Sequence, residues 1–90
     1  MLNKVAKVEA LGGFRLRVRF ADGAVADHDF NGQINKTGPM LEPLRDPAYF
    51  ARVHLEHGAL TWPNGYDMCP DWLRMTLEEA GELRTNAAAQ

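Results

Sequence analysis

The run FRLRVRF, residues 14–20, alternates strictly between apolar and basic side chains. Because successive side chains of a strand point to opposite faces of a sheet, this run predicts a strand with one buried face and one solvent-facing face. The break ADG follows, and then the run AVADHDF, residues 24–30, returns. Together these segments predict an antiparallel β-hairpin.

The length of the hairpin loop decides which side chains pair across it. A three-residue loop with a left-handed glycine is a common type. It places Arg17 opposite Asp27 and Arg15 opposite Asp29, so that opposite charges meet. A two-residue loop would instead set Val18 opposite Asp27, because a slip of one residue turns every side chain to the other face. The pattern therefore predicts the three-residue loop.

Other alternating or turn-rich segments predict the remaining strands and loops. Residues 4–11 predict a first strand, and residues 53–58 and 59–62 predict two short strands joined at Gly58. The segment 31–44 is rich in Gly, Pro and Asn, which predicts a loop with one short helical turn near its end.

Two short sequences predict helix starts. Asp46 precedes Pro47, and an acidic N-cap before a proline at the first helical position is typical of a helix start. This helix is expected to run to about Arg52. Cys69 precedes Pro70 in the same way and predicts the start of the last helix.

Large apolar residues surround the start of the last predicted helix. Met68 and Leu73 occupy the positions of a hydrophobic staple, and Leu77 follows Leu73 at helical spacing. Trp62 ends the preceding strand and Trp72 lies in the first helical turn. Both tryptophans are expected to pack in the core between sheet and helix.

The predicted order is three strands, a loop, a helix, two strands and a helix. This order is typical of an α+β fold, with a largely antiparallel sheet of about five strands and two helices packed on one face. Ninety residues make one domain, residues 1–90. Its ordered core is expected over about residues 4–82, with a frayed tail at 85–90.

Composition limits the classes of function. The net charge is −2, so the chain as a whole has no electrostatic attraction to nucleic acid or anionic lipid. A single cysteine excludes an internal disulfide and a thiolate zinc cage. No apolar run approaches the roughly 18 residues of a membrane span, and the N-terminus lacks the apolar core of a signal peptide. The expected location is the cytoplasm.

Arg15, Arg17 and Arg19 share the polar face of the best predicted strand. They are a candidate nucleic-acid contact, because a row of basic side chains can follow phosphates. Asp27 and Asp29 would neutralise two of them, and no aromatic side chains interleave with them as in single-strand binders. A solvated, self-paired sheet face is therefore preferred, with a protein-binding face as a further alternative.

Cys69 is a candidate nucleophile, because a helix N-terminus favours a thiolate. Asp67 and Asp71 flank it and disfavour that negative charge, so a structural N-cap role is preferred. The same aspartates with His54 and His57 give a weak pattern for a metal site. The two histidines are three residues apart in a predicted strand, which places them on opposite faces.

The chain has no phosphate-binding glycine loop, serine-hydrolase motif or zinc-protease motif. We therefore predict no catalytic residues, no cofactor and no metal.

Three segments stand out together with the pair Asp29-Phe30: FADG at 20–23, LRDPAYFARV at 44–53 and WPNGYDMCPDWL at 62–73. Over roughly residues 4–77 they resemble the small bacterial family known as domain of unknown function 2442. The resemblance implies an α+β fold, and it gives no established catalytic residues to carry over. Members are often encoded beside a second small module, in pairs like toxin–antitoxin systems. Some members carry a following helix-turn-helix domain, for which this chain is expected to end too soon.

The leading hypothesis is a non-enzymatic cytoplasmic interaction module, one partner in a two-protein system of toxin–antitoxin type. A small protein is the expected partner, a homodimer is an alternative assembly, and no membrane is involved. The alternative from another class is a nucleic-acid-associated regulatory module that uses the arginine strand, and a weaker one is a small enzyme that uses Cys69. The candidate interaction surface comprises Arg15, Arg17, Arg19, Trp62, Asp67 and Trp72.

Overall fold

The computed structural model describes residues 3–35 and 38–85. In these two ranges, seven strands form two antiparallel sheets. Sheet A has the strand order β1-β2-β3-β7, and sheet B has the order β4-β5-β6. The strands are β1 (Val5–Gly12), β2 (Arg15–Phe20), β3 (Ala24–Asp29), β4 (His54–Glu56), β5 (Ala59–Thr61), β6 (Asp67–Met68) and β7 (Arg84–Thr85).

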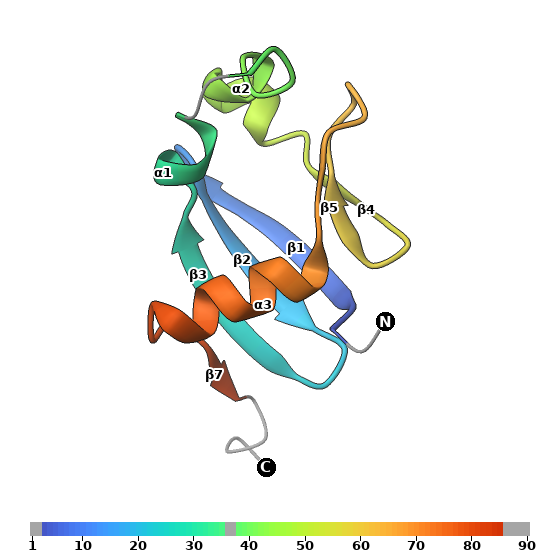
Figure 1. The fold of residues 1–90 in the computed structure, drawn as a ribbon, viewed down its shortest axis with the longest axis vertical. Coiled ribbons are helices and arrows are strands. Elements are labelled where there is room, and N and C mark those ends of the chain that lie inside the picture. The colour runs from blue at the N-terminus through green and yellow to red at the C-terminus, as the bar shows by residue number, and fades with distance from the viewer. Residues whose placement is uncertain (1–2, 36–37, 86–90) are drawn as a thin grey trace.

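Helix α3 runs across one face of sheet A, and the β4–β5 hairpin stands beside β1 (Figure 1). Two one-turn helices, α1 and α2, lie together at one end of the molecule (Figure 1). No helix in the described part of the chain is long and apolar enough to cross a membrane. The helices are α1 (Asn31–Ile34), a 3-10 turn (Pro43–Arg45), α2 (Pro47–Phe50) and α3 (Pro70–Glu79).

The α+β class is confirmed, but the prediction of one sheet of about five strands with two helices is wrong. The β4–β5 hairpin belongs to a second sheet. A backbone hydrogen bond from the Val5 N–H to the Gly58 carbonyl, 2.8 Å long, joins it to the start of β1. Helix α1 occupies a segment that was predicted to be loop. The predicted frayed tail, 85–90, lies outside the described residues except for Thr85, which is in β7.

The β2–β3 hairpin has the predicted register. Arg17 lies opposite Asp27, and Arg15 lies opposite Asp29. The three-residue loop has Gly23 in the left-handed region, at φ +95°. Charge pairing and apolar alternation together were sufficient to choose this loop over the two-residue one.

Only one of the two predicted charge pairs is an ion pair among the described residues. Arg17 donates to Asp27 twice, with Nε–Oδ1 2.8 Å and Nη2–Oδ2 3.1 Å. Asp29 instead accepts a hydrogen bond from the Asn31 backbone N–H at 2.9 Å, which satisfies one of the free donors at the start of α1. Arg15 makes no ion pair within residues 3–35 and 38–85.

The Arg17–Asp27 pair predicts a specific pH dependence of stability. Hydrogen bonds from Arg17 lower the pKa of Asp27 below its ordinary value. A carboxylate with a lowered folded pKa stabilises the fold above its unfolded pKa of about 3.9, and this contribution is lost as the pH falls through the folded pKa. We expect Asp27→Asn to lower the free energy of unfolding at neutral pH and the difference from wild type to vanish in acid.

Carboxyl chemical shifts followed by NMR from neutral to acid pH give the direct measurement. In Arg17→Ala the pKa of Asp27 should rise towards its ordinary value. Arg15→Ala is the matched control and should leave the Asp27 titration unchanged. An equal effect of the two arginine variants would contradict the assignment of the pKa shift to the Arg17 contact.

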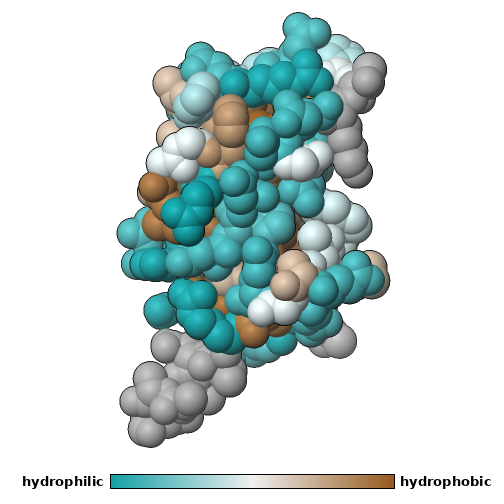
Figure 2. All heavy atoms as spheres, turned by 90° about the vertical axis from the view of Figure 1, so that its left-hand side faces the viewer, coloured by the Kyte–Doolittle hydropathy of each residue, from teal (hydrophilic) through white to brown (hydrophobic). Residues whose placement is uncertain are grey.

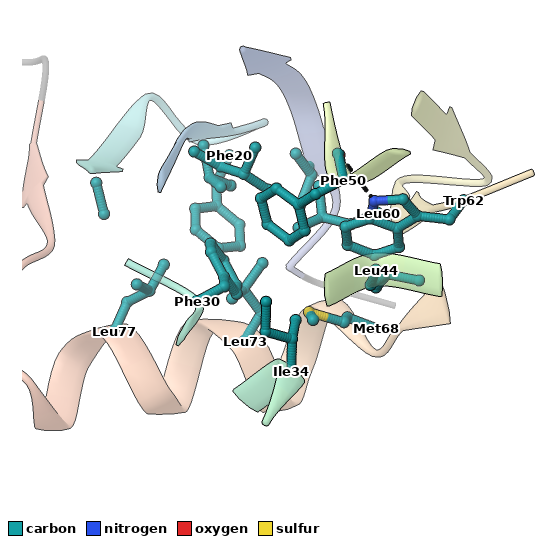
Figure 3. Packing of buried hydrophobic residues seen from close by; sticks show 14 of the residues in the cluster. Phe20, Phe30, Ile34, Leu44, Phe50, Leu60, Trp62, Met68, Leu73 and Leu77 are labelled. Carbon is teal, nitrogen blue, oxygen red and sulfur yellow. Dashed lines mark hydrogen bonds between the residues drawn. The ribbon is translucent and has the colours of Figure 1, made fainter. Parts of the chain in front are cut away.

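One cluster of buried apolar side chains fills the space between the sheets and α3. Leu73 and Leu77 lie on the side of α3 that faces Phe20 and Phe30 (Figure 3). Met68 and Leu73 are both buried, as expected of the predicted staple around the helix start. This placement fixes which face of α3 turns inward.

The predicted helix starts are correct, and one predicted helix end is not. The Asp46 carboxylate accepts from the Ala48 N–H at 3.1 Å, so it is the N-cap of α2. That helix ends at Phe50 rather than near Arg52. Cys69 occupies the N-cap position of α3, but its side chain makes no capping hydrogen bond.

Strand β1 lies at the edge of sheet A and departs twice from regular pairing. Register shifts occur between Val5 and Lys7 and again between Ala10 and Gly12. Such bulges bend a strand and leave an extra residue unpaired. They also break the simple alternation that the sequence suggests for residues 4–11.

The side of the molecule that carries α1, β3 and the C-terminal end of α3 is mostly hydrophilic (Figure 2). Its hydrophobic areas are small and separated from one another (Figure 2). Scattered apolar atoms are normal on a protein surface, whereas a contiguous patch marks an interaction site. This side of the molecule therefore does not have the character of an apolar interaction surface.

Candidate functional site

The outer face of sheet B is hollowed into a pocket of about 480 Å³. Leu60, in the middle of β5, is fully buried in the core. Its neighbours Ala59 and Thr61 point the other way and line the pocket. The polar residues of the lining are His54, Glu56, His57, Thr61, Asp67 and Cys69. We call this hollow the sheet B pocket.

Strand pairing brings the polar groups together. His54 of β4 lies opposite Thr61, and Glu56 lies opposite Ala59. On the other side of β5, Thr61 also lies opposite Asp67 of β6. Residues directly opposite each other in an antiparallel pair share a face. Three short strands therefore present one polar surface.

The turn between β4 and β5 adds a second histidine. His57 and Gly58 both have positive φ, at 53° and 78°. Two successive left-handed residues make the tight hairpin turn whose twist matches the flanking strands. This turn lies outside the strand alternation, so His57 lines the same pocket as His54. The prediction that the two histidines lie on opposite faces is wrong.

The base of the pocket is continuous with the core. Trp62 is 1% exposed, and its indole N–H donates to the Phe50 carbonyl at 2.9 Å (Figure 3). Its ring lies 5.5 Å from the Phe50 ring and 5.9 Å from the Tyr66 ring, centroid to centroid. The predicted core position of Trp62 is confirmed, and the same side chain also lines the pocket together with Pro63 and Pro70.

The pocket lining contains two carboxylates, Glu56 and Asp67, and no lysine or arginine. Glu56 accepts from the His54 ring, with Nε2–Oε2 2.8 Å. Asp67 has no side-chain hydrogen bond or ion pair within the described part of the chain. Burial, and to a smaller extent the negative charge of Asp67, raise the pKa of the neighbouring Tyr66.

Cys69 lies in the pocket with both histidines, a proximity that the sequence alone did not establish. Its thiol is exposed and makes no hydrogen bond to any described residue. A cysteine nucleophile needs a base within hydrogen-bond reach. Within residues 3–35 and 38–85, no three His, Cys, Asp or Glu side chains are grouped to hold a metal ion.

We expect Cys69→Ser to fold normally and to keep any binding activity of the chain. Serine is a better N-cap than cysteine, because its hydroxyl can accept from the free N–H groups at the start of α3. Chemical denaturation and a binding assay on both forms give the measurement. A variant that folds normally but loses activity would show that the thiol has a chemical role.

Trp72 is 37% exposed, so the prediction that it packs in the core is wrong. Leu73 and Leu77 form the buried side of α3. Because each helical residue is turned by about 100° from the previous one, Trp72 falls at the flank of that side. Met75, 53% exposed, lies three residues further on and so on a neighbouring part of the helix surface. We call Trp72 and Met75 the α3 pair.

The three predicted arginines lie together on the outer face of sheet A and are exposed. Strand register places five basic and three acidic side chains on this outer face, which we call the basic face. By contrast, the whole chain has a net charge of −2. A shallow hollow of about 100 Å³ lies between β1 and β2 there. The members are Lys7, Arg15, Arg17, Arg19 and Arg84, with Glu9, Asp27 and Asp29.

The predicted interaction residues therefore fall on separate surfaces. Trp62 and Asp67 both line the sheet B pocket. Trp72 lies on the exposed side of α3, two residues after the pocket residue Pro70. The arginines belong to the basic face of the other sheet. The sequence did contain a signal for the pocket. The residues on either side of Leu55 and of Leu60 alternate with these leucines, and such alternation predicts that they lie together on the opposite face of the two strands.

Comparison with known proteins gives one family. No curated protein and no solved structure matches the chain. A family model described as a protein of unknown function (DUF2442) matches residues 5–77. This match covers most of the 90 residues and includes all three segments that carry the sequence resemblance. The chain belongs to the DUF2442 family.

Proposed function

We propose that this chain is a non-enzymatic binding module that acts in the cytoplasm by contact with a small protein partner, as one half of a system of toxin–antitoxin type. The observation that carries the proposal is that a polar pocket and an exposed aromatic side chain both occur near the start of α3. Pro70 lines the sheet B pocket, and Trp72, two residues later in the same helix, is 37% exposed. This part of the chain therefore offers a polar hollow and, on a different side of the helix, an apolar contact area.

The composition of this surface favours a protein partner. Tryptophan and methionine are enriched at the centres of protein interfaces, where they supply much of the binding energy. The α3 pair provides both residue types, exposed on one helix. The sheet B pocket provides polar groups that can fix the orientation of a bound partner.

The second candidate is nucleic-acid contact through the basic face. It is favoured by the excess of basic over acidic side chains on that face. It is weakened by Asp27, which binds Arg17 and also lies 3.6 Å from Arg84. Phosphate contacts need basic groups that are free to replace counterions, and two of the five are already engaged.

Affinity capture from the source organism separates the two candidates. Tagged wild-type chain should retain one protein in stoichiometric amount at low and high salt, and also after nuclease treatment. The double variant Trp72→Ala with Met75→Ala should lose that protein while keeping the unfolding midpoint of wild type. Arg15→Ala with Arg19→Ala is the matched control and should retain it.

Two other results would contradict the proposal. Nucleic acid that is released by high salt and lost in the arginine variant would support the basic face. A protein retained equally by wild type and by the variant without the α3 pair would show that the partner binds elsewhere.

A further inference from the structure

We infer that the sheet B pocket binds the cationic side chain of an arginine presented by the partner. The inference rests on the proposed function and adds the chemistry that the partner must bring. Four polar groups of the pocket carry it: His54, Glu56, Thr61 and Asp67.

The hydrogen-bonding roles of two of these groups are fixed by their neighbours. The Glu56 carboxylate can only accept, so the His54 Nε2 atom that contacts it carries the proton. In the neutral ring the other nitrogen, Nδ1, is then an acceptor. The Thr61 hydroxyl donates its single proton to the Ala59 carbonyl at 3.1 Å, which leaves its lone pairs as acceptors. Thr61, and His54 when its ring is neutral, therefore offer acceptors to a ligand.

The two carboxylates add further acceptors on either side. Glu56 comes from β4 and Asp67 from β6, the two outer strands of sheet B. Glu56 lies opposite Ala59 and Asp67 lies opposite Thr61, so the two residues sit on either side of β5 and are offset by two residues along it. With strands about 4.8 Å apart and a rise of about 3.4 Å per residue, their backbones are about 12 Å apart. A group bound over β5 lies within reach of both carboxylates. Neither carboxylate has a lysine or arginine partner among the described residues.

This pattern selects a donor-rich cation. A guanidinium group has five N–H donors in a fixed plane and no acceptor, so it matches the acceptors offered by Thr61, the neutral His54 ring and the two carboxylates. Lysine offers a smaller ammonium group with three donors. The pocket volume of about 480 Å³ lies within the usual range for binding sites of about 300–1,000 Å³. Trp62, Pro63 and Pro70 give an apolar wall for the stem of the side chain.

The test uses a short peptide, acetyl-Ala-Arg-Ala-amide, added up to millimolar concentration to the full chain labelled with nitrogen-15. Amide shifts should change saturably in β4, β5 and β6 and stay constant in sheet A. The neutral analogue with citrulline in place of arginine should cause no comparable change. Equal binding of the citrulline peptide, or shifts centred on sheet A, would overturn the inference.

Variants test the named acceptors. Asp67→Asn and Thr61→Val should each weaken binding of the arginine peptide by about threefold or more, because each removes an acceptor for a charged donor. Glu79→Gln, a carboxylate on the exposed side of α3, is the matched control and should bind as wild type does. Asp67 is exposed, so Asp67→Asn should fold, and the amide spectrum of the variant reports this directly. Unchanged affinity in the folded variant would contradict the inference.

The outcomes separate this inference from the proposed function. If a protein partner is captured but the arginine peptide does not bind in the pocket, the inference is wrong and the binding function stands. If the peptide binds in the pocket but capture with wild-type chain yields no protein, the pocket chemistry stands and the proposed function is wrong.

Discussion

Replacing Trp62 by alanine should lower the free energy of unfolding by about 3–5 kcal/mol, the usual cost of removing a large buried aromatic side chain. The indole is 1% exposed and packs against the rings of Phe50 and Tyr66. Its N–H also satisfies the Phe50 carbonyl, which the variant leaves without that donor. Domains of this kind have a total stability of about 5–15 kcal/mol, so the variant should be marginally stable.

Trp72→Ala is the matched control, because it removes the same side chain from the surface. Trp72 is partly exposed, and its removal should cost less than about 1 kcal/mol, as for most surface substitutions. Guanidinium denaturation of both variants, followed by circular dichroism, gives the comparison. Equal losses of stability would contradict the assignment of Trp62 to the core and Trp72 to the surface.

Gly58→Ala should be the second strongly destabilising change. Gly58 has φ +78°, where a Cβ atom costs about 1–2 kcal/mol. The new Cβ would also lie 2.9 Å from Cβ and Cγ of Lys4, which are too close to the backbone to swing aside. Overpacking of this kind costs about a further 1–3 kcal/mol. We therefore expect a loss of about 2–5 kcal/mol, measured by chemical denaturation.

Gly81→Ala isolates the steric part of this effect. Gly81 has φ +70°, close to that of Gly58, but a Cβ there would meet no atom within 4 Å. Gly81→Ala should therefore lower the free energy of unfolding only by the cost of placing a Cβ atom at positive φ. If Gly58→Ala costs no more than Gly81→Ala, the close contact between Gly58 and Lys4 does not limit the packing of the two sheets.

Local interactions explain what the sequence predicted correctly. The register of the β2–β3 hairpin depends on residues no more than 14 apart, Arg15 and Asp29 being the outermost pair. Alternation, one left-handed glycine and opposite charges all favour the same loop there. The start of α3 was equally predictable, because proline and the staple residues Met68 and Leu73 are all within a few positions.

The arrangement of the sheets could not be predicted in the same way. Whether β4 and β5 continue sheet A or form another sheet depends on contacts with β1, which is distant in sequence. Strands of two residues, such as β6 and β7, carry too little alternation to be recognised. Helix α1 has no side-chain N-cap hydrogen bond, so its start lacks the usual signal.

The candidate site was predicted only in part for related reasons. Trp62 and Asp67 were among the predicted interaction residues and both line the pocket, but the pocket also needs the β4–β5 turn. His57 enters it because that residue adopts a left-handed conformation, which is uncommon for a residue other than glycine. Trp72 was misplaced because two adjacent large apolar residues compete for one helix face, and the staple decides the choice in favour of Leu73.

The two bulges of β1 have a consequence for how copies of this chain can associate. β1 is the longest strand and lies at the edge of its sheet, the position from which fibrils and edge-to-edge dimers grow. A new strand would have to follow its irregular backbone and pass the charged side chains of Lys7 and Glu9. Natural proteins protect open edges by these same means. Strand addition at β1 is therefore disfavoured, and a partner that binds at this edge must recognise side chains rather than extend the backbone.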